Sequence, residues 1–245
     1  MRASAALLAL PALATAQQMQ IPFLDEIKGF FNKASSSISS AVPSAPSINP
    51  VAASAAKFAE LNVQRLTLSN WDSVLKPGAA TASPGIEEWM VMITGGNKTC
   101  YGRCQRAEEA WNESVALVSA SPTAPSLAML NCETDGVLCS AWALSPPTVM
   151  HVQLPQPLAD QSTPATTVRA INLNASTITA PEIAAIHLQE TYKNTAPYEG
   201  LWHPFDGPLA KNGLSIPVGW AIWGFGQIPS WMFMIGVSFI SRNVM

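Results

Sequence analysis

The sequence has few charged side chains and lacks the basic surface that a nucleic-acid-binding protein needs. Charged residues make up 12% of its 245 residues, and 13 basic side chains stand against 16 acidic ones, so the formal net charge is -3. Binding to a phosphate backbone requires clustered Lys and Arg. We therefore expect no nucleic-acid partner, and the length allows one domain with extensions at its ends.

Histidine is also scarce, and the motifs of several enzyme classes are missing. The chain has three His residues, and His151 and His203 lie in no Ser-His-Asp order and beside no pair of carboxylates. Gly95-Gly96 reads as a turn and does not match a phosphate-binding loop. The sequence thus favours neither a hydrolase triad nor a nucleotide site.

The N-terminus carries the features of a secretory signal. A basic residue, Arg2, precedes a short apolar run over residues 5–13, and Ala14-Thr15-Ala16 has the small residues of a cleavage site. Sequons for N-glycosylation support export, because three of them occur in one chain. Their acceptors are Asn97, Asn112 and Asn174.

Near the C-terminus, residues 218–240 form an uncharged apolar run of 23 residues. A helix that spans a bilayer needs about 20 such residues, so we expect one transmembrane helix here. The alternative is a re-entrant or interfacial hairpin broken at residues 226–229, which contain Pro229. With the signal removed, the domain would face the lumen and residues 241–245 the cytosol.

Between these ends the hydrophobic patterns predict one α/β domain. Continuous apolar runs are typical of central strands, and apolar residues at helical spacing lie between them. We expect strands at 88–94, 126–131, 148–154 and 166–173, a strand and helix over 63–75, and helices at 100–118, 134–142 and 178–192. The expected divisions are a signal peptide (1–16), an amphipathic segment and Ser/Ala/Pro-rich linker (17–61), the domain (62–193), a juxtamembrane loop (194–217), the transmembrane segment (218–240) and a tail (241–245).

Cysteine is sparse, with four residues, but their positions are informative. Cys100 and Cys104 follow the first long apolar run, and Cys132 and Cys139 bracket a turn after the next one. In an exported domain such residues are expected to be oxidised.

The stretch from Asn131 to Thr148, with Cys132, Cys139 and a Pro-Pro-Thr before an apolar strand, resembles the second half of a thioredoxin-fold domain of the protein disulfide isomerase type. The resemblance implies a thioredoxin-like fold, with a central mixed sheet flanked by helices. It also implies a cis-proline at Pro147, so that Ser145, Pro146 and Pro147 form a substrate-binding turn facing the dithiol. Cys132 and Cys139 match the second, non-catalytic pair of such domains and would form a structural disulfide.

By the same resemblance Cys100 is the nucleophile and Cys104 the resolving thiol, with client proteins that carry thiols or disulfides as partners and no organic cofactor. A helix beginning at Cys100 would favour its thiolate through the helix dipole. The chain departs from the active isomerases in several respects. Thr99 replaces the Trp before the first Cys, the spacing is Cys-x3-Cys without a His, and residues 89–93 offer no buried carboxylate.

Two hypotheses follow from the cysteines. The first is a membrane-anchored thiol–disulfide oxidoreductase of the endoplasmic reticulum, and the second is a non-catalytic binding or adaptor module in which Cys100–Cys104 is structural. Cys-x3-Cys with a distant His, here His187, also resembles the cytochrome oxidase copper chaperones. Their prolines after the cysteines are missing, and their lack of glycosylation does not fit the sequons. We therefore expect no metal site and an exposed His187.

Overall fold

A computed structural model describes residues 50–77, 85–158, 160 and 162–244, and its centre is a mixed sheet. The strand order is β1-β3-β2-β4-β5. The first three strands in this order are parallel, and β4 and β5 add antiparallel pairs. This arrangement confirms the expected α/β fold. The strands are β1 (Gln64–Leu66), β2 (Ile86–Thr94), β3 (Ser126–Asn131), β4 (Thr148–Pro155) and β5 (Thr167–Asn172).

Strand β2 is buried because it has a neighbour on each edge and a helical layer on each face. Its residues Met90, Val91, Met92 and Ile93 are completely inaccessible to solvent. A strand buried on both faces loses the alternation of polar and apolar side chains, which explains the continuous apolar run in the sequence.

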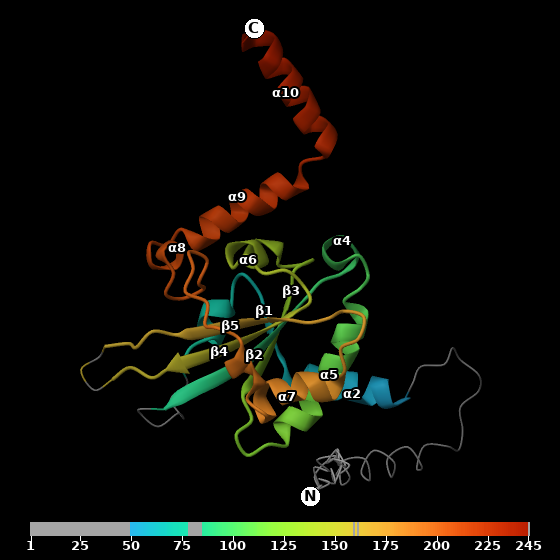
Figure 1. Ribbon diagram of the computed structural model, residues 1–245, viewed down its shortest axis with the longest axis vertical. Helices are drawn as coiled ribbons and strands as arrows, with labels where there is room; N and C mark the ends of the chain where they lie inside the picture. Colours follow the sequence, from blue (N-terminus) through green and yellow to red (C-terminus); the bar gives the residue numbers. More distant parts are fainter. Residues whose placement is uncertain (1–49, 78–84, 159, 161, 245) are drawn as a thin grey trace, which may run out of the picture. The chain divides into compact units, whose positions relative to one another are not determined.

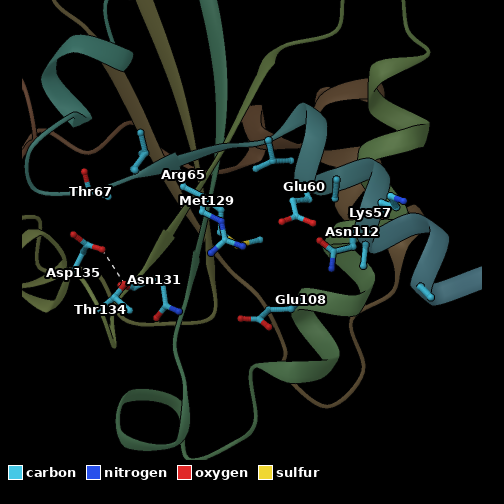
Figure 2. A pocket seen from close by; sticks show the side chains of 15 residues that line it. Lys57, Glu60, Arg65, Thr67, Glu108, Asn112, Met129, Asn131, Thr134 and Asp135 are labelled. Atoms are coloured by element: carbon cyan, nitrogen blue, oxygen red, sulfur yellow. Dashed lines mark hydrogen bonds between the residues drawn. The ribbon is translucent and has the colours of Figure 1, made fainter. Parts of the chain in front are cut away.

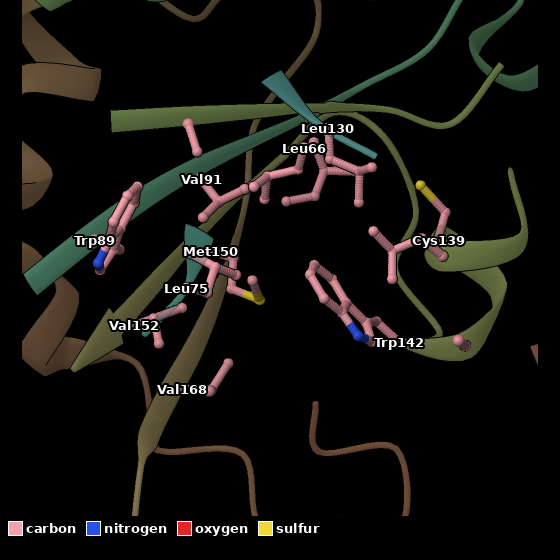
Figure 3. Close-up of a cluster of buried hydrophobic side chains, with 14 of the residues drawn as sticks. Leu66, Leu75, Trp89, Val91, Leu130, Cys139, Trp142, Met150, Val152 and Val168 are labelled. Carbon is pink, nitrogen blue, oxygen red and sulfur yellow. The ribbon is translucent and has the colours of Figure 1, made fainter. Parts of the chain in front are cut away.

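Helices cover both faces of the sheet (Figure 1). On one face, α5 and α7 pack against Met90 and Met92, and α2 adds Ala59 to the same cluster. On the other face, α3 and α6 pack on the opposite side chains of β2 (Figure 3). These helices are α2 (Pro50–Asn62), α3 (Trp71–Val74), α5 (Gln105–Ser119), α6 (Gly136–Ala141) and α7 (Ala180–Leu188), with a short 3-10 turn η1 (Thr191–Asn194) after α7.

The segment after η1, expected as a juxtamembrane loop, is fastened to the sheet. The Tyr198 amide donates to the carbonyl of Val168 in β5. The Asp206 carboxylate accepts from the Thr166 amide at 2.7 Å, and His203 Nε2 lies 3.1 Å from the Thr166 carbonyl oxygen. Residues 198–206 therefore pack on the start of β5, and α8 (Pro208–Lys211) follows them.

The prediction that residues 218–240 form one continuous helix is wrong. The segment forms two helices, α9 (Ser215–Gln227) and α10 (Ser230–Val244), with Ile228 between them in an extended conformation. Pro229 explains the break, because proline lacks an N–H and pushes the preceding residue out of the helical region. Within the described ranges, no helix combines the length and apolar character that crossing a bilayer requires.

The first half of α9 belongs to the folded domain. Gly219 lies so close to α6 that a β-carbon there would come within 2.7 Å of the Val137 carbonyl oxygen and 2.8 Å of the Ala141 β-carbon. The expected signal peptide (1–16) and residues 17–49 of the expected amphipathic segment and linker lie outside the described residues. Residues 50–61 of that expected linker lie in helix α2.

Candidate redox centre

The first cysteine pair lies beyond the C-terminal end of β2. The chain turns at Gly95 and Gly96, forms the single helical turn α4 (Asn97–Cys100), and reaches Cys104 just before α5. Tyr101 and Gly102 both have positive φ angles, 53° and 71°. This left-handed pair reverses the chain between the two cysteines, and only glycine adopts that conformation without steric cost.

The two sulfurs form a disulfide with a Cα–Cα distance of 5.8 Å. Cys100 is 6% exposed and Cys104 is 1% exposed, whereas residues 101–103 between them are exposed. Cys100 is therefore the more accessible of the two residues from solvent.

The expectation that a helix starts at Cys100 needs correction. Cys100 is the last residue of α4, and its amide donates to the Gly96 carbonyl. The long helix starts at Gln105, and Cys104 is its N-cap residue. The extra residue of the Cys-x3-Cys spacing is taken up by the left-handed turn. The positive end of the helix dipole therefore acts on Cys104, not on Cys100.

The proline turn lies beside this centre. In the sheet register Ile93 is opposite Thr148, so the turn that precedes Thr148 meets the chain that leaves β2. A β-carbon placed on Gly95 would lie 3.2 Å from Pro146 Cγ, and it would also collide with the Thr99 side chain. The bond between Pro146 and Pro147 is cis, as the resemblance implies.

Hydrogen bonds hold this turn from both sides. The Thr148 hydroxyl donates to the Ser145 carbonyl at 2.6 Å, and the Leu173 amide donates to the Pro147 carbonyl at 3.1 Å. Pro146 itself has no N–H, so its backbone can offer an extended peptide an acceptor but no donor.

Glu108 is a candidate that the sequence did not reveal. It lies one turn after Cys104 on the same side of α5, and its carboxylate accepts a hydrogen bond from the Thr94 hydroxyl at the end of β2. Figure 2 shows this side chain at a pocket of about 780 Å³, which Asn112 also lines. The i, i+4 spacing to Cys104 is the sequence signal for Glu108. The resemblance implies a carboxylate only on the preceding strand, whereas Glu108 lies on the helix.

The second cysteine pair is also joined, with a Cα–Cα distance of 5.6 Å between Cys132 and Cys139. Both residues are buried, and Cys139 lies in the cluster of Figure 3 together with Leu130 and Trp142. The Cys132 amide donates to the Thr94 carbonyl. This pair thus ties α6 to the end of β3, next to the strand that leads to the first pair.

The sequon asparagines differ in exposure. Asn97 and Asn174 are exposed, whereas Asn112 is half-buried in the middle of α5. Asn97 is the first residue of α4, close to the disulfide.

The expectation of an exposed His187 is wrong. This residue is 8% exposed. Its imidazole and that of the fully buried His151 both lie close to the Glu88 carboxylate. His151 lies in β4, and His187 lies in α7, 36 positions later in the sequence (187 minus 151).

Comparison with known proteins agrees with this architecture. A family model described as "tRNA hydrolases-like, Thioredoxin-like domain" matches residues 49–225, which includes the segment after η1 and most of α9. No curated protein matches the chain.

Solved structures that resemble the chain are distant. The thioredoxin-like domain of Arabidopsis NCP (nuclear control of PEP activity) is 14% identical, with 54% of this chain and 78% of that chain covered and a TM-score of 0.38. The first thioredoxin domain of mouse protein disulfide-isomerase A4 is 16% identical, with 54% and 76% covered and a TM-score of 0.34. ERdj5 form II is 14% identical, with 54% of this chain and 15% of that chain covered and a TM-score of 0.36.

Proposed function

Because the chain belongs to the tRNA hydrolases-like, thioredoxin-like domain family, we propose that it exchanges thiols and disulfides with client proteins through Cys100 and Cys104. One observation supports this proposal above the others. The disulfide and the Pro146–Pro147 turn lie at the same edge of the sheet, where Gly95 separates them with no room for a side chain. An extended client segment on the turn would then hold its sulfur near Cys100.

The proposed reaction uses no external reagent. In the reduced protein, the Cys100 thiolate attacks a client disulfide, a mixed disulfide forms, and one client sulfur leaves as a thiolate. Cys104 then loses its proton and attacks the Cys100 sulfur. The client leaves with two thiols, and the protein keeps the Cys100–Cys104 disulfide seen here. The reverse sequence oxidises a client dithiol.

The roles of the two cysteines follow from their different surroundings. Cys100 is the more exposed and is therefore the attacking thiol. Cys104 caps α5, whose dipole stabilises a thiolate there, and Glu108 one turn later is the candidate acceptor of its proton.

A trapping experiment tests this assignment. Cys104→Ser should leave Cys100 joined to client proteins, because the resolving thiol is gone, and the adducts should disappear on reduction. Non-reducing gels and mass spectrometry of the adducts provide the measurement. The matched control is Cys100→Ser, which should form few adducts. Adducts from Cys100→Ser alone would reverse the roles, and none from either variant would favour the adaptor.

The adaptor module is the second candidate function, and the near-complete burial of both sulfurs favours it. In that case the same proline turn binds a client without exchange. We propose no tRNA substrate, despite the family description, because the net charge is -3 and a phosphate backbone requires a basic surface.

We further propose that the protein works in the lumen of the endoplasmic reticulum, attached to its membrane through the C-terminal segment. The signal-like pattern of the N-terminus, the exposed sequon residues Asn97 and Asn174, and the paired cysteines support the compartment. Exposed apolar side chains on α10 support the attachment, including Phe233, Ile235 and Val237. The membrane fraction of producing cells should contain the protein in a form whose mass falls on endoglycosidase treatment. An unglycosylated protein in the soluble fraction would contradict this placement.

A further inference from the structure

Glu88, His151 and His187 form a compact group of ligand-type side chains. Glu88 Oε2 lies 3.2 Å from His187 Nδ1 and 3.7 Å from His151 Nε2. One ligand atom from each residue lies within 4.8 Å of the other two. Glu88 is near the start of β2, so this group is at the opposite end of that strand from the Gly95–Gly96 turn.

The hydrogen bonds of His187 determine which nitrogen is available. Its Nε2 lies 2.7 Å from the carbonyl oxygen of Thr123. A carbonyl can only accept, so Nε2 carries the hydrogen and donates it. In the neutral ring, Nδ1 then carries a lone pair, which faces a carboxylate oxygen of Glu88. Two such acceptors at 3.2 Å repel each other unless a proton or a metal ion lies between them.

His151 adds a second nitrogen to the same oxygen. This ring is fully buried, and both of its nitrogens lack a hydrogen-bond partner among the described residues. Buried polar groups without partners cost free energy, and a ligand between His151 Nε2 and Glu88 would satisfy one of these two nitrogens. The Tyr192 ring stacks on His151 with centroids 3.8 Å apart, which fixes the plane of the imidazole.

An outer layer of contacts holds the carboxylate as well. Glu88 Oε1 accepts from Gln153 Nε2 at 2.9 Å, which leaves Oε2 toward the histidines. Gln153 Oε1 in turn accepts from Arg169. Metal-binding histidines commonly donate their second N–H to a backbone carbonyl, and their carboxylate ligands are hydrogen-bonded in turn. His187 shows the first feature and Glu88 the second, whereas Nδ1 of His151 has no such partner among the described residues.

The ligand types and the two distances from Glu88 Oε2 suit a transition-metal ion, and the two histidine nitrogens lie within 4.8 Å of each other. Tetrahedral zinc at its usual bond lengths places neighbouring ligand atoms about 3.3 Å apart, close to the 3.2 and 3.7 Å observed. Two imidazoles and a carboxylate are a known zinc set that leaves the fourth position to water. A cavity of about 640 Å³, lined by Glu88, His187 and Tyr192, connects the group to solvent.

We propose that Glu88, His151 and His187 bind one divalent transition-metal ion, for which Zn²⁺ is the matched probe. The site is separate from the thiol–disulfide centre and does not depend on it. A bound ion would link α7 to β2 and β4, because each of these elements supplies one ligand.

Calorimetric titration of the full-length chain with ZnCl₂ tests the proposal. The protein is first treated with a chelator, and a thiol assay confirms that both disulfides are oxidised, so that no cysteine competes. One equivalent of Zn²⁺ should bind, and the melting temperature should rise. Glu88→Gln, which keeps the size of the side chain, should weaken binding about tenfold or more, and so should His151→Phe. The matched control is Glu190→Gln, which removes a carboxylate from the same cavity outside the group and should bind as the unsubstituted chain does.

A second measurement on the unsubstituted chain covers the case in which a variant does not fold. In nitrogen-15 spectra of the imidazoles, Zn²⁺ should shift the ring nitrogens of His151 and His187 and leave those of His203 unchanged. No stoichiometric binding by the unsubstituted chain, binding that Glu88→Gln leaves unchanged, or shifts at His203 alone would each overturn the proposal.

Discussion

His203 shows how one buried side chain fixes a whole segment. Its Nδ1 accepts the amides of Phe205 and Asp206 at 3.2 and 2.9 Å, so Nε2 carries the hydrogen and donates to the Thr166 carbonyl. The neutral ring therefore satisfies three backbone groups at once. Burial lowers the pKa of His203 below its ordinary value of 6.5, against the opposing effect of Asp206.

Because its pKa is lowered, His203 makes the free energy of unfolding depend on pH. Below about pH 6.5 the unfolded chain takes up a proton that the folded chain excludes, so the free energy of unfolding falls as the pH falls. His203→Asn removes this titration while its side-chain oxygen can still accept the two amides. The variant should be less stable by about 1–3 kcal/mol at about pH 7.5, and the difference should shrink toward about pH 5.5. Urea unfolding at both values measures it, and a difference that stays constant or grows in acid would refute this reading.

At this scale the sequence predicted the cysteine and proline positions better than the other site residues. Spacing paired Cys100 with Cys104, and the resemblance implied the turn at Pro147, because each feature lies within a short stretch of sequence. The contacts of Glu108, His151 and His187 could not be predicted, because they join elements that are distant along the chain. No pattern in the sequence indicates that His151 and His187 share one carboxylate.

Among the elements, α9 differs most from its sequence-based interpretation. Its apolar run predicts part of one membrane-spanning helix, yet Gly219 packs directly on α6, the helix that carries Cys139. Trp223 reaches the same helix, since a β-carbon on Gly136 would lie 2.6 Å from Trp223 Nε1. Hydropathy alone does not distinguish an apolar helix that packs on protein from one that packs on lipid.

Two glycines of α9 offer a matched test of this packing. Gly219→Ala places a β-carbon against the Val137 carbonyl and Ala141, and should destabilise the protein by about 1–3 kcal/mol through overpacking. Gly224→Ala on the same helix meets nothing within 4 Å, so it should be neutral or stabilise by up to about 1 kcal/mol. Denaturant unfolding of the two variants measures both effects. Equal stabilities would show that α9 does not pack on α6 in solution.

At the scale of the whole molecule, the topology of the sheet brings together the parts of the candidate redox centre. Parallel β2 and β3 end at the same edge, so both cysteine pairs follow their C-terminal ends. Antiparallel β4 starts at that edge and brings the proline turn to it. The order of elements was predictable from apolar runs and turns. The bend at Tyr101-Gly102 was not, because it depends on local backbone angles that a Cys-x3-Cys spacing does not specify.

The reduction potential of the Cys100–Cys104 pair tests the central claim most directly. The full-length protein would be equilibrated across a series of glutathione ratios, and labelling of each cysteine would be read by mass spectrometry, with Cys132–Cys139 as the internal comparison. An exchange centre predicts a potential between about -120 and -270 mV, the range of proteins that carry out this reaction. A value below about -300 mV, typical of structural disulfides, would contradict the exchange function and leave the adaptor module.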